Sequence, residues 1–462
     1  MKQLLSRVFG AILCLGAGYT QAENPSGTQS SSVQPGGVVF ENVRVFDGTS
    51  QRLSESVNVL VAGNVIQEIS PTSVELPPGM DITRIEGGGR TLMPGLIDAH
   101  THLMMATLPP AVILTSDIGF INVAAVKAAN DMLLRGFTSV RDLGGPVFGL
   151  KRGIDTGLVP GPRIWPAGAM ISQSGGHGDF RLPNELPASP DSFHYMQRVG
   201  AAEIADSPDL VRQRTREQLA LGASQVKLMA GGGVSSNYDP LDVTQYTVPE
   251  LRAAVEAAEN WGTYVTVHAY TPRAVQQAIE AGVTCIDHGQ LLDEATVKLM
   301  AKKGLWWSLQ PFTTDRKSTF VEGSPNRLKQ LQVSEGTESA YALAKKYKVK
   351  TAWGTDILFS SEAALTQGAL LAKMTQWYTP AEALKMATAD NAQLLAMSGL
   401  RSPYSGKLGV VEEGALADLL LVDGDPLQDI NLVADPARNF LIIMKDGKIY
   451  KSTLPRAVGT ES

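Results

Sequence analysis

Short apolar runs alternate with longer stretches of helical periodicity through the middle of the chain. Eight of these runs predict strands, among them "FTSVRDLG", "YVTVHAY", "VTCIDHG" and "WWSLQPF", and most precede a helical stretch. Two helical stretches open with a capping pattern, in which Thr247 or Thr379 is followed three residues later by a glutamate. Eight strand-then-helix units predict an α/β fold, a (β/α)8 (TIM) barrel over residues 94–405.

The two ends of the chain carry a different pattern. Residues 38–93 and 406–452 contain short runs of alternating apolar and polar residues between glycine-rich turns, which is typical of β-strands. Because chain ends often lie close together, we expect both segments to form one small β-sandwich. Residues 172–207 are polar and irregular, and we expect this long connection to fold over the active face of the barrel.

The first 22 residues have the features of a signal peptide. Lys2 and Arg7 give a basic start, and the apolar run "VFGAILCLGAG" is too short to span a bilayer comfortably. We therefore expect cleavage after residues 1–22, export to the periplasm or the outside, and a flexible leader over residues 23–37. We expect no membrane contact after cleavage.

Composition and charge restrict the class of partner. With 44% hydrophobic and 19% charged residues, the chain is typical of a folded globular protein. Loss of two positive charges with the signal peptide changes the net charge from −6 to −8, which argues against a nucleic-acid partner. Cys285 is then the single cysteine, which excludes an internal disulfide and a cysteine-rich metal site. We expect a small-molecule substrate and a homo-oligomer.

Two of the six histidines, His100 and His102, end the first apolar run, "LMPGLIDAHTHLM". On a strand they point the same way, roughly 6.5–7 Å apart along the chain. Two imidazoles in an apolar setting need partners for their nitrogens. A divalent metal ion is one such partner, and a pair of hydrogen-bonded core histidines is the alternative.

Further ligand-type residues fall at the ends of other predicted strands. They are His268 in "VHAY", His288 in "DHG" and Asp356 in "GTD". In a TIM barrel the carboxyl ends of all strands meet at one mouth, so we expect these side chains to converge with the first two histidines. A lone strand histidine is usually a core residue, but five such residues at strand ends favour a metal site.

Lys227 lies within the apolar strand "QVKLMAGGG", where a charged ammonium is penalised. An ion pair with a carboxylate is one explanation. The other is carboxylation by carbon dioxide, which converts the cation into a carbamate able to bridge two metal ions. We favour the carbamate, because two divalent ions would repel an ammonium.

Together, "PGLIDAHTH", the strand lysine, "VHAY", "DHG" and "GTD" resemble the amidohydrolase superfamily, in its subtype with two metal ions and a carboxylated lysine. The motifs "SGGHGD", "KLMAGGGVSSNYDP" and "ATADNAQLL" look most like its imidazolonepropionase-related and Xaa-Pro dipeptidase group, which includes ochratoxin-hydrolysing amidohydrolases. The resemblance covers nearly the whole mature chain. It implies that His100, His102 and Asp356 hold the more buried metal ion, that His268 and His288 hold the other, and that Lys227 bridges the two.

From this site we expect a hydrolase that cleaves the amide of dipeptides or N-acyl amino acids, including carboxypeptidase-like and ochratoxin-type substrates. Two divalent metal ions would supply a bridging hydroxide and polarise the carbonyl. Zinc is the default for histidine and carboxylate ligands, and manganese, cobalt and iron are the alternatives. Asp356 would then move the proton to the leaving nitrogen. One alternative is a hydrolase of imidazolone, hydantoin or lactam rings, and the other is an exported binding protein without activity.

A substrate with a free carboxylate needs hydrogen-bond donors outside the metal ligands. His177 in "SGGHGD" and Tyr238 in "SSNYDP" lie on loops at the predicted active face, and Arg141 ends the second strand. For Arg141, a structural ion pair with a neighbouring acid is the alternative. Several acids of the last segment are interpreted as turn and scaffold residues: Glu412, Glu413, Asp418, Asp423 and Asp425.

Overall fold

The computed structural model describes residues 36–189, 192–236, 238–315 and 318–454. The predicted signal peptide, residues 1–22, and nearly all of the predicted leader lie outside the described residues. Gly37, the last residue of that leader, already begins the first strand, β1 (Gly37–Val45). In the described part of the chain, no helix has both the length and the apolarity that a membrane crossing requires.

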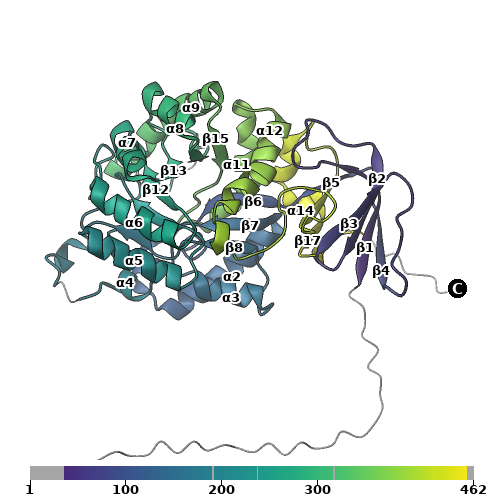
Figure 1. Cartoon of the computed structure of the whole chain (residues 1–462), viewed down its shortest axis with the longest axis horizontal. Coiled ribbons are helices and arrows are strands. Elements are labelled where there is room, and N and C mark those ends of the chain that lie inside the picture. The colour runs from purple at the N-terminus through teal and green to yellow at the C-terminus, as the bar shows by residue number, and fades with distance from the viewer. Residues whose placement is uncertain (1–35, 190–191, 237, 316–317, 455–462) are drawn as a thin grey trace, which may run out of the picture. The chain divides into compact units, whose positions relative to one another are not determined.

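Strands from both ends of the chain pair in one eight-stranded sheet, which we call the β module. Its order is β18-β17-β16-β5-β1-β2-β3, with β4 paired to β1. The antiparallel pairing of β5 with β16 joins the two ends, as the purple and yellow segments of Figure 1 show. The two-layer sandwich stays a prediction. Besides β1, the strands are β2 (Ser56–Ala62), β3 (Val65–Ser70), β4 (Ile82–Glu86), β5 (Thr91–Pro94), β16 (Leu419–Val422), β17 (Phe440–Lys445) and β18 (Lys448–Ser452).

The middle of the chain forms two parallel sheets, and this confirms the α/β class. The three-stranded sheet consists of β6 (Leu96–Thr101), β7 (Phe137–Asp142) and β8 (Arg163–Pro166). The other sheet has the order β10-β9-β11-β12-β13-β14-β15. Its strands are β9 (Met170–Ser172), β10 (Ala202–Ile204), β11 (Val226–Met229), β12 (Val265–Ala269), β13 (Cys285–His288), β14 (Trp306–Leu309) and β15 (Lys350–Trp353).

Backbone hydrogen bonds connect the ends of these two sheets. The amide of Asp356, just after β15, donates to the carbonyl of His100 in β6 at 2.9 Å. The amide of Ser224, just before β11, donates to the carbonyl of Pro166 in β8 at 2.7 Å. The bonds therefore bring the carboxyl ends of β6 and β15 together, which is where the candidate ligands lie.

Two predicted strands are in fact pairs of strands. The first divides at Gly95 into β5 of the β module and β6 of the parallel sheet, because a Cβ at Gly95 would lie 2.1 Å from Thr138 Oγ1. The third divides into β8 and β9, in different sheets, around Gly168 with φ +76°. Residues 172–207, predicted to be irregular, contribute β10 to the edge of the seven-stranded sheet.

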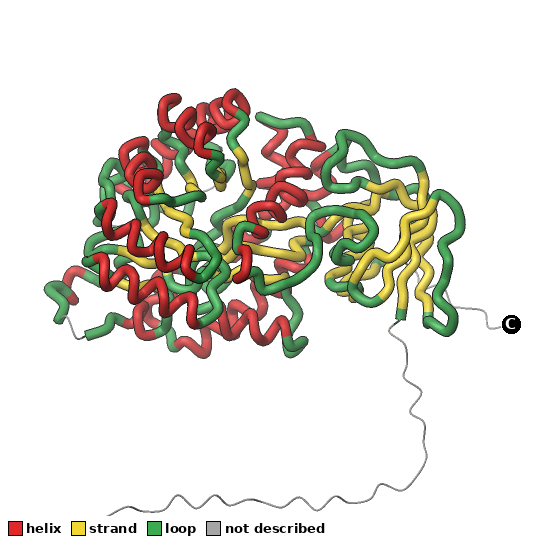
Figure 2. Tube along the Cα trace, viewed as in Figure 1, coloured by secondary structure: helices red, strands yellow, loops and turns green. Residues whose placement is uncertain are grey.

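Helices cover the outside of the parallel strands (Figure 2). The capping predictions are confirmed, because the Glu250 and Glu382 carboxylates accept the amides of Thr247 and Thr379 at 2.7 and 2.8 Å. The helices are α1 (Pro110–Thr115), α2 (Ile118–Leu134), α3 (Phe148–Asp155), α4 (Tyr195–Arg198), α5 (Pro208–Ala220), α6 (Val248–Asn260), α7 (Pro272–Ala281), α8 (Glu294–Lys303), α9 (Pro325–Tyr347), α10 (Ser361–Ala364), α11 (Gln367–Ala372), α12 (Pro380–Lys385), α13 (Asn391–Ala396) and α14 (Pro436–Asn439).

Candidate active site

One pocket at the carboxyl ends of the parallel strands collects the predicted ligands. It is lined by five of the six histidines together with Lys227 and Asp356. The five are His100, His102, His177, His268 and His288. The sixth, His194, forms an ion pair with Glu185 at 3.2 Å. The strand-end rule therefore brings all six predicted metal ligands to one place, and His177 joins them from the loop after β9.

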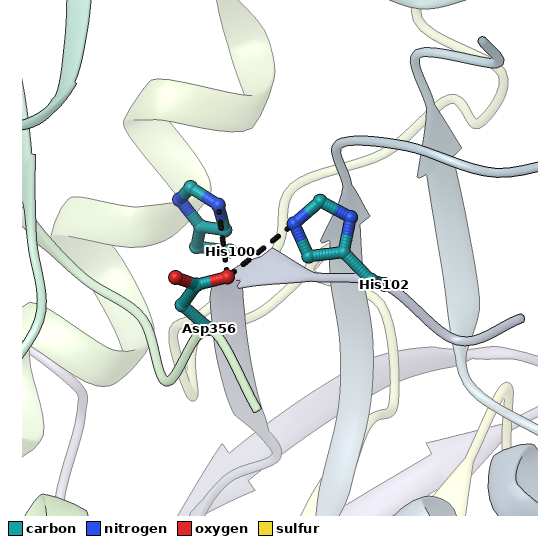
Figure 3. Close-up of side chains that lie close together, drawn as sticks. All are labelled: His100, His102 and Asp356. Carbon is teal, nitrogen blue, oxygen red and sulfur yellow. Dashed lines mark ion pairs between the residues drawn. The ribbon is translucent and has the colours of Figure 1, made fainter. Parts of the chain in front are cut away.

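The closest group within the pocket is made by His100, His102 and Asp356. The Nε2 atoms of the two histidines lie 3.5 and 3.4 Å from Asp356 Oδ1. Figure 3 shows both rings turned toward this carboxylate. One ligand atom from each residue falls within 4.8 Å of the others, which is a spacing that a single metal ion can bridge.

Two candidate ligands have a backbone conformation that non-glycine residues rarely adopt. The φ angles of His288 and Asp356 are +73° and +47°. Such left-handed conformations cost about 1–3 kcal/mol each and cluster at functional sites. Here they occur where the chain leaves β13 and β15, and they accompany side chains that line the pocket.

Three histidines each donate a hydrogen bond to an oxygen acceptor through one ring nitrogen. The lone pair of the other ring nitrogen can then bind a metal ion. The Nδ1 atoms of His102 and His288 donate to Gly144 O at 3.2 Å and to Gln310 Oε1 at 2.8 Å. His268 Nε2 donates to Gly232 O at 3.1 Å. Metal-binding histidines are held in this way by an oxygen acceptor on the far nitrogen. The donor set therefore fits divalent metal ions.

Protonation also suits metal ligands. Burial lowers the pKa of His100 to about 4, and it holds the pKa of His268 and His288 well below the ordinary value. These rings are thus neutral near pH 7, which is the metal-binding form. Burial raises the pKa of Asp356, but the neighbouring histidines more than offset this, so its pKa lies well below the ordinary value. His102 differs, because its contact with Asp356 outweighs burial and raises its pKa.

Lys227 is buried and its Nζ donates to Asp287 Oδ2 at 2.6 Å. This is the ion pair that the sequence left open as the alternative to carboxylation. The Asp287 carboxylate also accepts bonds from Arg141 Nη2 at 2.6 Å and from Thr266 Oγ1 at 2.7 Å. Burial alone would raise the pKa of Asp287, but Lys227 and Arg141 hold it well below the ordinary value.

Sequence reasoning missed Asp287, although its motif "DHG" was used for His288. The available signal was the need for a buried counter-charge, since both Lys227 and Arg141 lie in apolar strands. Arg141 is 0% exposed and also donates to Ala99 O at 2.7 Å. The prediction that Arg141 binds substrate is therefore corrected. Arg141 is not among the residues described as lining the pocket, and it forms the structural ion pair with Asp287.

The two loop candidates differ. His177 lines the pocket and stacks on His268, with ring centroids 4.0 Å apart, and its Nδ1 hydrogen-bonds Ser236 Oγ at 2.7 Å. Tyr238 is 45% exposed and does not belong to the pocket lining that the structure describes. The structure thus brings His177 to the site and leaves Tyr238 outside it, because the loop turns the tyrosine toward solvent.

The walls of the pocket are mainly apolar and were not predicted from the sequence. They include Met105, Met170, Phe180, Met229, Phe312 and Phe320. A few polar groups, such as Tyr270, Gln330 and Ser334, interrupt this surface. An apolar wall around a small set of polar groups is typical of a small-molecule pocket.

The acids of the last segment make scaffold contacts. Asp418 pairs with buried Arg163, Asp423 pairs with Arg90, and Asp425 accepts the amide of Leu427. Glu412 pairs with Lys407, and Glu413 accepts the amide of Ile69. Turn chemistry thus applies to Asp425, whereas Asp418 belongs to a buried ion cluster.

Residues 91–450 match the family model described as "Amidohydrolase family". The chain belongs to the amidohydrolase family. It is 31% identical to ochratoxinase from Aspergillus niger over 382 residues, which are 78% of this chain and 75% of that protein. This amidohydrolase is therefore a hydrolase that acts on amide bonds, and the family relationship implies a TIM barrel for its parallel strands.

Solved structures agree with this relationship. A prolidase in complex with N-methylphosphonate-L-proline is 35% identical, with a TM-score of 0.81, and covers 90% of the amidohydrolase and 100% of its own chain. An Xaa-Pro dipeptidase with methionine bound in its active site is 27% identical, with a TM-score of 0.75 and coverage of 90% and 100%. The predicted resemblance to this superfamily is thus confirmed.

Proposed function

We propose that this amidohydrolase hydrolyses the amide bond of dipeptides or N-acyl amino acids. One observation carries the proposal: five imidazoles, a carboxylate and a buried lysine line a single pocket with apolar walls. The similar proteins add support, since one is named ochratoxinase, one is a prolidase holding an L-proline derivative, and one is a dipeptidase holding methionine. Amino-acid substrates of this kind combine an anionic end with an apolar side chain, and the second part suits the walls.

We propose two divalent metal ions, zinc by the histidine and carboxylate chemistry of the donors. Bound in this pocket, they would polarise the scissile carbonyl and lower the pKa of water. The residues that would hold them are His100, His102 and Asp356 for one ion, His268 and His288 for the other, and Lys227 between the two. The bonds that three of these rings make to oxygen acceptors through one nitrogen support this arrangement, because they leave the proton on that nitrogen and the lone pair on the other.

Carboxylation of Lys227 is part of the proposal. The ammonium would first lose one proton; the Nζ atom of the neutral amine would then form a bond to the carbon of carbon dioxide and release a second proton, so that an anion replaces a cation. Asp287 would lose the ammonium as a partner but keep Arg141 and Thr266, at 2.6 and 2.7 Å. The carboxylate would therefore stay paired after the change.

Asp356 is proposed as the catalytic acid–base group. Its Oδ1 lies within 3.5 Å of the Nε2 atoms of both His100 and His102. Its low pKa keeps the carboxylate ionised, so it can accept a proton. It would take a proton from the attacking water and pass it to the leaving nitrogen. His177 is proposed to donate to the substrate carboxylate, because it lines the same pocket and lies outside the proposed metal ligands.

Architecture, export and assembly complete the proposal. We propose a closed (β/α)8 barrel, a β-sandwich formed by both chain ends, cleavage of residues 1–22 during export to the periplasm or the outside, and a homo-oligomer. N-terminal sequencing of the protein recovered from a cell fraction tests cleavage and location. Light scattering on the purified protein tests the oligomeric state.

The decisive experiment is turnover of a substrate panel by protein of measured metal content. The panel contains Xaa-Pro dipeptides, N-acyl amino acids with apolar side chains, and imidazolone, hydantoin and lactam rings. We expect the linear amides to be cleaved, and Asp356→Asn protein serves as the matched blank. Ring opening without cleavage of linear amides would replace the proposal by the cyclic-amide alternative. Binding without turnover of either class would contradict it.

A further inference from the structure

The loop after β11 contacts two of the pocket histidines. We call it the β11 loop, residues 230–236 and 238–239. The carbonyl of Gly232 accepts the bond from His268 Nε2, and the hydroxyl of Ser236 bonds His177 Nδ1. Val234 and Ser235 of the same loop line the pocket. The position of the β11 loop therefore affects both rings and one wall of the site.

The β11 loop packs so closely that two of its positions exclude a side chain. A Cβ atom at Gly233 would lie 1.9 Å from the His177 ring, and one at Gly232 would lie 1.8 Å from the carbonyl oxygen of Pro240. These contacts explain why glycine occupies positions 232 and 233, the last two of "AGGG". They also mean that a small displacement of the loop would move the His177 ring.

Helix α9, which lies far along the chain, supplies the hydrogen-bond donors that hold the β11 loop. Lys329 Nζ donates to the carbonyls of Gly233 at 2.7 Å, Ser236 at 2.8 Å and Asp239 at 3.1 Å. An ammonium has three protons, so each finds one carbonyl. Asn326, one turn earlier, donates from Nδ2 to two loop carbonyls, at 2.7 and 3.1 Å.

The same helix also forms part of the pocket. Gln330, next to Lys329, and Val333 and Ser334 one turn later line the site. Lys329 itself is half-buried and lies outside the residues described as lining the pocket. The hydrogen bonds of this lysine go to the β11 loop, and through the loop they reach the pocket.

We propose that Lys329 is a positioning residue of this amidohydrolase. Its ammonium clamps the β11 loop against α9 and so fixes the His177 ring and the adjacent wall. The clamp acts on substrate binding more than on the chemical step, because Lys329 bonds Gly233 and Ser236, which contact His177, and does not bond Gly232, whose carbonyl accepts from His268. Without the ammonium, three loop carbonyls lose a charged donor, and the loop and His177 become less well placed.

The test is the Lys329→Met variant, which keeps the length of the side chain and removes every donor. Loss of hydrogen bonds from a charged group should raise KM about tenfold, with kcat and metal content near those of the parent. Hydrogen–deuterium exchange should accelerate in peptides that cover the β11 loop. The exchange measurement needs no substrate, so it tests the clamp even if the proposed substrate class is wrong.

Two further variants complete the design. Asn326→Asp keeps the shape but replaces the amide donor by an anion facing carbonyls, so it should change KM and exchange in the same direction. Lys346→Met is the matched control on α9, because Lys346 pairs with Glu294 at 2.7 Å at the surface and should alter neither quantity. Unchanged KM and exchange in Lys329→Met, loss of metal, or a fall in kcat at constant KM would each overturn the proposal.

Discussion

Two ion clusters of the chain, one buried and one partly exposed, share charge in opposite ways. In the first, which we call the pocket cluster, one carboxylate holds two cations, and in the second, the module cluster, one cation holds two carboxylates. The pocket cluster consists of Arg141, Lys227 and Asp287, and the module cluster of Arg163, Asp418 and Asp446. The first reaches the pocket through Lys227, and the second joins β8 to the β module.

Their surroundings differ as much as their charges. The side chains of the pocket cluster are at most 1% exposed, whereas the Asp446 side chain of the module cluster is 45% exposed. Water can therefore solvate the additional negative charge of the module cluster, but it cannot reach the additional positive charge beside the pocket. Of the three members of the pocket cluster, Lys227 is the one that lines the pocket, which makes it the member on which a functional role is proposed.

The largest effect is expected at the carboxylate that faces the pocket. Asp356→Asn should lower kcat by about 10²–10⁴-fold, because general acid–base catalysis is worth this much, and it should change KM much less. Asp418→Asn of the module cluster is the comparison and should leave kcat unchanged per folded molecule. Steady-state kinetics on both variants measure this. An Asp356→Asn enzyme with normal kcat and raised KM would contradict the assigned role.

Lys227→Ala should remove most bound metal and lower kcat/KM by more than about 100-fold. Loss of a residue that only supports a metal ligand costs up to about 100-fold, and Lys227 is proposed as a ligand itself. The buried Lys445 of the β module provides the matched control, since Lys445→Ala should reduce stability without loss of metal. Elemental analysis measures the metal content of the two variants, and steady-state kinetics measures their kcat/KM. Short carboxylic acids should restore some activity to Lys227→Ala alone. Two bound metal ions at a normal rate would rule out the carbamate.

In metal-free protein, in which Lys227 is an ammonium paired with Asp287, Asp287→Asn should destabilise the fold by about 3–5 kcal/mol, because it leaves two buried cations without their carboxylate. The same change at Asp418 leaves one cation that still has the partly exposed Asp446, so its cost should be smaller. Urea denaturation of both variants gives the two free energies of unfolding. Equal losses of unfolding free energy in the two variants would show that the number of cations left unpaired in each cluster does not govern stability.

The smallest effect is expected at the surface of the β module. Asp423 pairs with Arg90 at 2.8 Å, with side chains 53% and 34% exposed, and such pairs contribute about 0–1 kcal/mol. Asp423→Asn should therefore lower the melting temperature slightly and leave turnover per folded molecule unchanged. A selective loss of turnover would instead indicate a second functional site in this segment.

The sequence predicted the strand-end residues well because local periodicity decides which way a strand side chain points. His100, His288 and Asp356 needed only that rule and the meeting of strand ends. To predict Asp287, one must know which carboxylate lies next to Lys227 in the folded protein. The two residues are 60 positions apart in the chain, and no local sequence pattern reveals their contact. The position of Tyr238 outside the described pocket lining was not predictable for a related reason, since the conformation of its loop depends on contacts with α9. Its role in substrate binding stays a prediction.

The fold was predictable to the same extent. Strand order along the chain indicated the α/β class, and the capping residues marked two helix starts correctly. The division of two strands at Gly95 and Gly168 was missed, because an apolar run does not reveal the close contacts that these glycines make, Gly95 with Thr138 and Gly168 with Phe148 and Gln218. The role of β10 was missed because its three residues carry too little pattern.

The pairing of Pro94 in β5 with Leu419 in β16 has a consequence for the order of events during synthesis. The amino-terminal strands emerge first, yet β5 lacks its second neighbour until almost the entire polypeptide has been made. An open edge of this kind invites pairing with other chains. Completion of the β module must therefore be among the last steps of maturation, and a ribosome-bound chain that stops before β16 would carry an unfinished sheet beside already formed helices.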